Sequence, residues 1–363
     1  FASFCNGKVC RNATSIVSHK FSKQSSKPVL NCVWLGCSIV AQLAYGSKEC
    51  RTLLIDAGVC KALAMSLNKT LEWIKKVRKE KGETDPNPFS ALKQGLLGMI
   101  CLSSHSLEAQ NELGRNGGVE IALNSLDIEG QIDLIEPALL ALSALSSNCK
   151  QNSMKMYTKS CIATVAKLLA LKWEVGPETL LSATLEVASA SFQFEDKNFN
   201  KKSPDFVEIV ESLAESASKC AKKWRKFQAI QKRVCFLYQN LALQGFSAAL
   251  FKFDAENSIL KAMEAHSSST NVQFQALQAI ESLLSDKVGS ILNKSTVSAS
   301  KKAFLSLCMT KSQTKLKRDK TLKAAASIGQ KIFKIGDFSS NREAILIVLE
   351  VLKQLSPSEF EFS

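Results

Sequence analysis

The sequence predicts an all-α fold in which helical repeats stack into a solenoid, and three observations carry this prediction. The chain has 363 residues, more than the roughly 100–150 residues of one compact core, so its core must grow by repetition or be divided. Glycine (16), proline (7), tryptophan (4) and tyrosine (3) are scarce, which disfavours a large β-sandwich or barrel. A short motif also recurs along the chain. The apolar fraction of 45% and charged fraction of 22% are those of a folded protein and exclude wholesale disorder.

The recurring motif is a short helix, a glycine turn and a second helix. The segment Asp56–Val59 has a counterpart sixty residues later in Asn116–Val119. We align Gly58 with Gly118, because a glycine lets the backbone turn between helices at positive φ. A third copy begins at Lys159 with Ser160 in the glycine position. The short helices before the first two turns are expected at 47–56 and 106–115.

A longer third helix is expected to complete each unit. The candidates are residues 29–45, 89–103, 134–147, 178–191, 222–243, 271–285 and 316–335. The pattern resembles the armadillo repeat, a unit of three helices and about 42 residues. An insertion at 71–88 accounts for the longer spacing between the first two copies. The resemblance implies a right-handed α-solenoid of armadillo/HEAT-like repeats, with HEAT-like or irregular helix pairs fitting equally well beyond residue 170.

The individual helices carry the expected local signals. Apolar residues at helical spacing, as in 162–169, give each helix one buried stripe. Ser203 before Pro204 predicts a helix start, and Thr270 with Gln273 predicts a capping box. Residues 193–204 are expected to form a loop. The predicted organisation is a basic N-terminal extension at 1–28, an armadillo-like repeat domain at 29–356 and a C-terminal tail at 357–363.

Positive charge is concentrated in blocks. The net charge is +14, yet three windows, 1–48, 216–253 and 287–318, together hold 22 basic residues and no acidic ones. The rest of the chain has 25 basic against 33 acidic residues. An acidic body with basic blocks indicates an oriented electric field and an anionic partner. Solubility with chance clustering is the alternative.

The most specific basic block is predicted to be one continuous helix at 219–243. Projected at 100° per residue, its cations occupy one face, and Trp224, Phe227, Ile230, Val234, Leu237 and Leu241 share another. In the armadillo family the third helices line a groove, where an asparagine holds the backbone of the ligand; the resemblance gives this role to Asn240. The predicted partner-binding residues are Lys222, Arg225, Lys226, Lys232, Arg233 and Asn240, joined by Lys315, Lys317, Arg318 and Lys323 of a later third helix.

This basic face predicts a non-catalytic interaction scaffold, or an assembly subunit of a larger complex, that binds an acidic protein or peptide. The alternative is nucleic-acid or ribonucleoprotein binding through phosphate contacts, for which aromatic side chains among the cations would stack on bases. Because Trp224 and Phe227 are interpreted as core residues, the scaffold is favoured. A solvated face without a partner is the third interpretation. A basic groove would repel a basic nuclear-localisation signal, so a cargo-receptor role is disfavoured.

Catalytic and cofactor motifs were not found. The sequence has no phosphate-binding glycine loop, no dinucleotide fingerprint and no zinc-protease motif. We therefore expect neither an enzyme nor a cofactor, a metal site or a small-molecule substrate. Cys101 and His105 could share a helix face, but a lone pair at this spacing is usually accidental.

The cysteines and the N-terminus bear on location. The twelve cysteines are dispersed, several of them in apolar helices, and do not resemble a disulfide framework. An intracellular, by default cytoplasmic, protein is expected. The acid-free first 27 residues resemble the composition of mitochondrial or plastid transit segments, which leaves an organelle open. Residues 28–47 are uncharged, but polar residues interrupt them, so we expect a buried helix and no membrane span.

Overall fold

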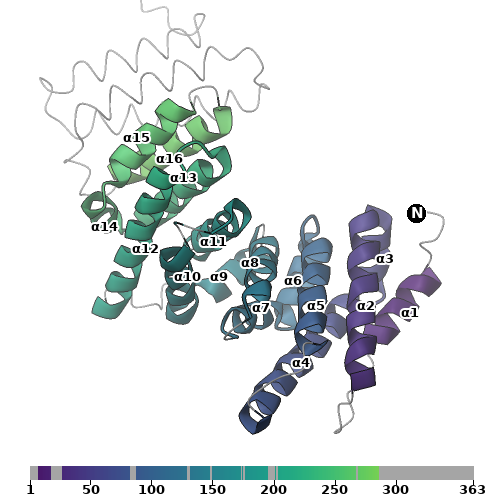
Figure 1. The fold of residues 1–363 in the computed structure, drawn as a ribbon. Coiled ribbons are helices and arrows are strands. Elements are labelled where there is room, and N and C mark those ends of the chain that lie inside the picture. The colour runs from purple at the N-terminus through teal and green to yellow at the C-terminus, as the bar shows by residue number, and fades with distance from the viewer. Residues whose placement is uncertain are drawn as a thin grey trace, which may run out of the picture. The chain divides into compact units, whose positions relative to one another are not determined.

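The structure is a computed structural model that describes residues 7–17, 27–81, 87–128, 131–147, 149–172, 174, 176–194, 201, 203–266 and 269–285. Every regular element within these ranges is an α-helix (Figure 1). The chain divides after Thr164 into two compact units, unit 1 and unit 2, which are described separately. Helices α1 to α9 belong to unit 1, α11 to α16 belong to unit 2, and the boundary falls inside α10.

The helices follow one another through short turns. In the first part of the chain they are α1 (Gly7–Val17), α2 (Lys27–Gly46), α3 (Lys48–Asp56), α4 (Val59–Lys81), α5 (Asn87–Ser103), α6 (Leu107–Arg115), α7 (Gly118–Leu126), α8 (Ile132–Ser146), α9 (Lys150–Met156) and α10 (Lys159–Lys172). The later helices are α11 (Glu178–Ser191), α12 (Pro204–Lys223), α13 (Gln228–Leu243), α14 (Ser247–Lys252), α15 (Ala255–Ala265) and α16 (Thr270–Ser285).

The order of a short, a middle and a long helix repeats along the chain. It is seen in α3 to α5, α6 to α8 and α14 to α16. The third helices pack side by side: α5 lies against α2 and α8 in unit 1, and α13 lies against α11 and α16 in unit 2. Five of the seven predicted third helices, α2, α5, α8, α11 and α16, are confirmed. The candidate at 316–335 lies outside the described residues.

The turn before a second helix uses left-handed backbone, as expected, but one residue earlier in the second copy. Gly58 has φ +77° and Gly117 has φ +89°, and each directly precedes a second helix. The alignment of Gly58 with Gly118 was therefore wrong, since Gly118 is already the first residue of α7. Asp254, at φ +62°, takes the same place before α15. Ser160 lies inside α10 and forms no part of a turn.

The continuous helix predicted at 219–243 is broken. Helix α12 ends at Lys223, and α13 begins at Gln228 after a turn in which Phe227 has extended backbone. The Gln231 amide holds this break, because its Nε2 donates to the carbonyl oxygens of Ala221 and Trp224, each at 3.0 Å. These carbonyls end α12 and would otherwise lack a helical donor. Downstream of the break the predicted stripe is confirmed, with Ile230, Val234, Leu237 and Leu241 buried.

Amides that reach back seven residues close several other helix ends in the same way. The Gln110 Nε2 donates to the Ser103 oxygen, and the Asn152 Nδ2 donates to the Leu145 oxygen. Gln273 donates to the oxygen of His266 at 3.0 Å, so it closes α15 and forms no capping box with Thr270. The cap of α16 lies one residue before the predicted one, where the Ser269 hydroxyl accepts from the Val272 amide.

The N-terminal segment and the insertion both contain helix. Within the expected extension at 1–28, α1 packs against α2, α3 and α4 and buries Cys10, Ala13 and Val17. Helix α4 runs on to Lys81, into the region assigned to the insertion at 71–88. Within the described residues, no helix combines the length and the apolar character that crossing a bilayer requires.

Candidate interaction surface

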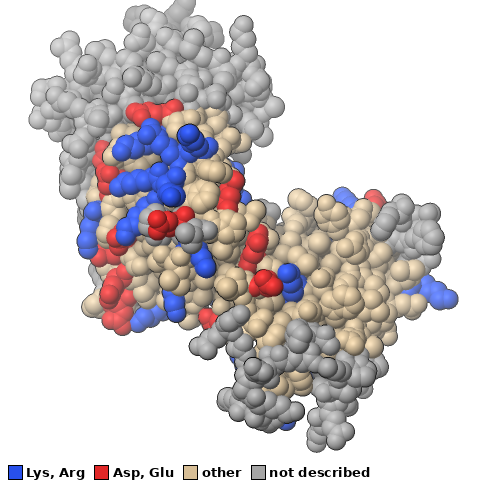
Figure 2. All heavy atoms as spheres, in the orientation of Figure 1, with Lys and Arg blue, Asp and Glu red and all other residues tan. Residues whose placement is uncertain are grey.

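Six cations surround the break between α12 and α13, and we call them the basic turn surface. They are Lys222, Lys223, Arg225, Lys226, Lys232 and Arg233. Two end α12, two lie in the turn, and two lie in the first turns of α13. Figure 2 shows Lys and Arg gathered over the helices of unit 2, with Asp and Glu bordering them. The two cations at the end of α12 also lie where the helix dipole favours positive charge.

Three of these cations meet carboxylates from distant parts of unit 2. Lys222 Nζ lies 3.7 Å from Asp254, and Arg225 Nη2 lies 3.2 Å from Glu264. These carboxylates stand at the two ends of α15. The backbone oxygen of Arg225 also lies 2.9 Å from the His266 Nε2. The two pairs join the end of α12 and its turn to both ends of α15.

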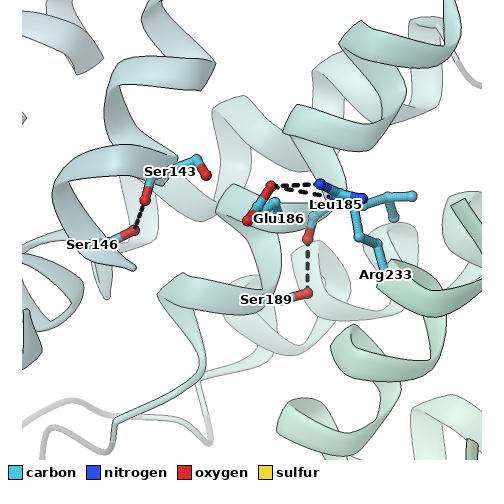
Figure 3. A network of polar contacts seen from close by, with 6 residues as sticks. All are labelled: Ser143, Ser146, Leu185, Glu186, Ser189 and Arg233. Carbon is cyan, nitrogen blue, oxygen red and sulfur yellow. Dashed lines mark hydrogen bonds and ion pairs between the residues drawn. The ribbon is translucent and has the colours of Figure 1, made fainter. Parts of the chain in front are cut away.

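The third ion pair joins α13 to α11. Arg233 contacts one carboxylate oxygen of Glu186 through Nε at 3.2 Å and Nη2 at 3.0 Å (Figure 3). The side chain of Arg233 is 30% exposed, and that of Glu186 is 39% exposed. Partial burial makes this pair less screened than the other two.

The remaining three cations keep their charge uncompensated. Lys223, Lys226 and Lys232 are exposed, and no ion pair reaches them from the part of the chain that the structure describes. Six positive charges thus meet three carboxylates, which leaves a local excess of three. An exposed ammonium group without a partner is free to bind an external anion.

Two aromatic side chains interrupt these cations, and both were assigned wrongly to the core. Phe227 is 40% exposed, and Trp224 is only partly buried. Their rings pack edge to face, with centroids 4.8 Å apart and an interplanar angle of 67°. The projection failed because it assumed one unbroken helix, whereas both residues belong to the turn. The surface therefore combines unpaired cations with exposed aromatic area.

Asn240 does not join this surface. Its side chain is 4% exposed, and its Nδ2 donates to the Ser189 oxygen of α11 at 2.8 Å. The amide that the family comparison assigned to a ligand is thus bound to the chain itself. The predicted residues Lys315, Lys317, Arg318 and Lys323 lie outside the described residues.

Thiols and histidines provide no activated group around this surface. Burial raises the pKa of the Cys37, Cys220 and Cys235 thiols to about 12, which disfavours the nucleophilic thiolate. Cys50 is disulfide-bonded, contrary to the expectation of free thiols. Among the residues described, no group of three His, Cys, Asp or Glu side chains is placed to hold a metal ion.

A second exposed feature lies in unit 1, where Asn31, Trp34, Leu35 and Ser90 line an open depression of about 510 Å³ between α2 and α5. Trp34 is 42% exposed and Leu35 is 49% exposed. None of the four carries a charge, and the face of unit 1 shown in Figure 2 is largely uncharged. Sequence reasoning missed this depression, because apolar residues in an uncharged helix are usually buried.

Comparison with solved structures identifies the fold as an armadillo-like repeat solenoid. One match is a designed armadillo repeat protein in complex with the peptide (KR)4, with a TM-score of 0.54 and 15% identity over 76% of this chain and 99% of that one. Another is a computationally designed armadillo repeat protein for modular peptide recognition, with a TM-score of 0.54 and 14% identity over 75% and 99%. An engineered protein matches with a TM-score of 0.55 and 16% identity over 76% and 97%. The sequence itself matches no family model and no curated protein.

Proposed function

We propose that this chain is a non-catalytic interaction scaffold or assembly subunit that binds an acidic protein partner through the basic turn surface. The observation that carries the proposal is the local excess of three positive charges at Lys223, Lys226 and Lys232. Exposed like charges contribute little to stability and repel each other. A cluster of this kind therefore serves binding better than folding.

The similar structures support a peptide-binding use of the fold. Two of them are described as peptide-recognition proteins, and one holds the basic peptide (KR)4. The basic turn surface has the opposite charge preference, so we propose that the partner of this chain is acidic. Complementary charge would steer the encounter and make it sensitive to salt.

Nucleic-acid binding is the second candidate, and one observation favours it. The exposure of Trp224 and Phe227 supplies the aromatic side chains among cations that single-stranded nucleic acids use for stacking. Against it stand Glu186, Asp254 and Glu264, which place three carboxylates within the same surface. A phosphate backbone carries a charge at every nucleotide and would meet these carboxylates, whereas a protein partner can place its acids selectively.

The test is affinity purification of the full chain from its native source, with and without RNase, at several salt concentrations. We expect the same protein partners after RNase treatment, with recovery that falls steeply as salt rises. Loss of every partner after RNase treatment would replace the scaffold with the nucleic-acid candidate. Recovery that is independent of salt would remove the basic turn surface from either role.

The variant for this test neutralises only the unpaired cations, as K223Q/K226Q/K232Q. Reversing Lys222, Arg225 or Arg233 instead would set like charges against Asp254, Glu264 and Glu186 and disturb the fold itself. The matched control, K61Q/K75Q/K167Q, removes the same charge at exposed positions elsewhere. We expect the first variant to lose the partner and the control to retain it.

A further inference from the structure

The exposed aromatic pair within the basic turn surface has a consequence for the ligand. Trp224 and Phe227 stand next to Arg225 and Lys226, so any acidic segment that reaches the cations also meets aromatic area. An exposed phenyl ring in a charged turn gains by being covered with apolar atoms. A ligand of carboxylates alone would leave this area in water.

We propose that the ligand is an acidic peptide segment that carries an aromatic or large apolar anchor, and that this anchor covers Trp224 and Phe227 while its carboxylates engage Lys223, Lys226 and Lys232. The inference rests on the proposed function and specifies its ligand. The edge-to-face arrangement of the two rings leaves Phe227 40% exposed and thus able to contact a third apolar group.

Charge excludes the opposite kind of peptide from this place. The face of an aromatic ring attracts cations, but the surrounding excess of three positive charges repels a basic anchor. A neutral aromatic or aliphatic side chain flanked by carboxylates satisfies both parts of the surface. The ion pairs at Asp254 and Glu264 hold the end of α12 and its turn against α15, so the ring pair lies on a braced segment.

The size of the apolar contribution follows from the exposed area. Full coverage of the 40% of Phe227 that is exposed removes on the order of 80 Å² from water. At about 25 cal/mol per Å² this corresponds to an affinity gain of up to roughly 30-fold. Ordering of the ligand reduces the gain, so we expect about 5- to 20-fold.

The experiment compares three labelled probes by fluorescence anisotropy with the full chain. The first is a twelve-residue peptide rich in Asp and Glu with one central Phe, the second has Ala in place of that Phe, and the third is a twelve-nucleotide single-stranded RNA. We expect the Phe peptide to bind about 5- to 20-fold more tightly than the Ala peptide. We also expect both peptides to weaken in K223Q/K226Q/K232Q.

Phe227→Ala tests the anchor, and Leu243→Ala is its control, because Leu243 is a 62% exposed apolar residue at the other end of α13. F227A should abolish the preference for the Phe peptide, whereas L243A should retain it. Thermal melting by circular dichroism checks that each variant is folded, and Phe227→Leu, which keeps apolar area, should retain most of the preference.

The outcomes separate the two proposals. Equal binding of the Phe and Ala peptides, or an equal effect of F227A and L243A, overturns the anchor but leaves the acidic partner. Binding of neither peptide overturns both. Tighter binding of the RNA than of either peptide, with loss in F227A, assigns the surface to single-stranded nucleic acid instead.

Discussion

Substitution of the turn glycines tests the repeat architecture itself. Gly58 has φ +77°, and a Cβ built on it meets no heavy atom within 4 Å. The cost of Gly58→Ala is therefore pure backbone strain, about 1 kcal/mol or somewhat more. The same cost is expected for Gly117→Ala, at φ +89°.

A glycine inside a helix provides the matched control with the opposite sign. Gly98 lies in α5, and its added Cβ would make only ordinary contacts, at 3.5 Å to Leu63 and 3.7 Å to Val40. Because glycine costs a helix about 0.5–1 kcal/mol relative to alanine, Gly98→Ala should stabilise by that amount. Gly118→Ala should destabilise for a steric reason, since its Cβ would lie 2.9 Å from the Leu113 oxygen.

The measurement is thermal and urea unfolding of the full chain followed by circular dichroism at 222 nm. A change of 1 kcal/mol corresponds to about 2–4 °C in Tm for a unit of this size. We expect Gly58→Ala and Gly117→Ala to lower the Tm and Gly98→Ala to raise it. Unchanged or increased stability in both turn variants would refute the left-handed turns and the repeat alignment based on them.

Three further predictions follow from the polar contacts and thiols. Asn240→Ala should destabilise by about 1–3 kcal/mol in urea melts, because it leaves a buried carbonyl of α11 without its donor, while affinity for the acidic peptide stays within two-fold. Gln273→Leu should lower the Tm through loss of the closure of α15, and a melt identical to that of the unmodified protein would contradict the assigned cap. At pH 8 a disulfide reagent should label the exposed Cys32 well before Cys37 or Cys235, since burial raises the pKa of the latter two to about 12 and shields them. Equal labelling rates in the folded protein would contradict that burial.

Much of the fold was predictable, because helical periodicity is written in local sequence. The buried stripe of residues 162–169 and the third helices at 89–103 and 178–191 follow from apolar spacing alone. The scarcity of turn and strand formers predicted the class. The glycine at 58 announced a turn, since only glycine enters left-handed backbone without strain.

The basic block showed the limit of this reasoning. The sequence placed the cations correctly near 222–233, yet the helix that carries them breaks at Trp224, and periodicity across a break assigns residues to the wrong face. The break depends on Gln231, an amide that looks like any polar surface residue until it meets the carbonyls that end α12. Its effect was to expose Phe227.

The sequence by itself determined an all-α repeat chain with dense positive charge at one place, because composition and spacing act through local structure. The tertiary structure alone decided which of those charges are available. Glu186 lies 47 residues from Arg233 and Glu264 lies 39 residues from Arg225, and only the packing of α11, α13 and α15 brings them together. Ion pairing is set by distances in space, so the three lysines free to bind an acidic partner emerge only from the fold.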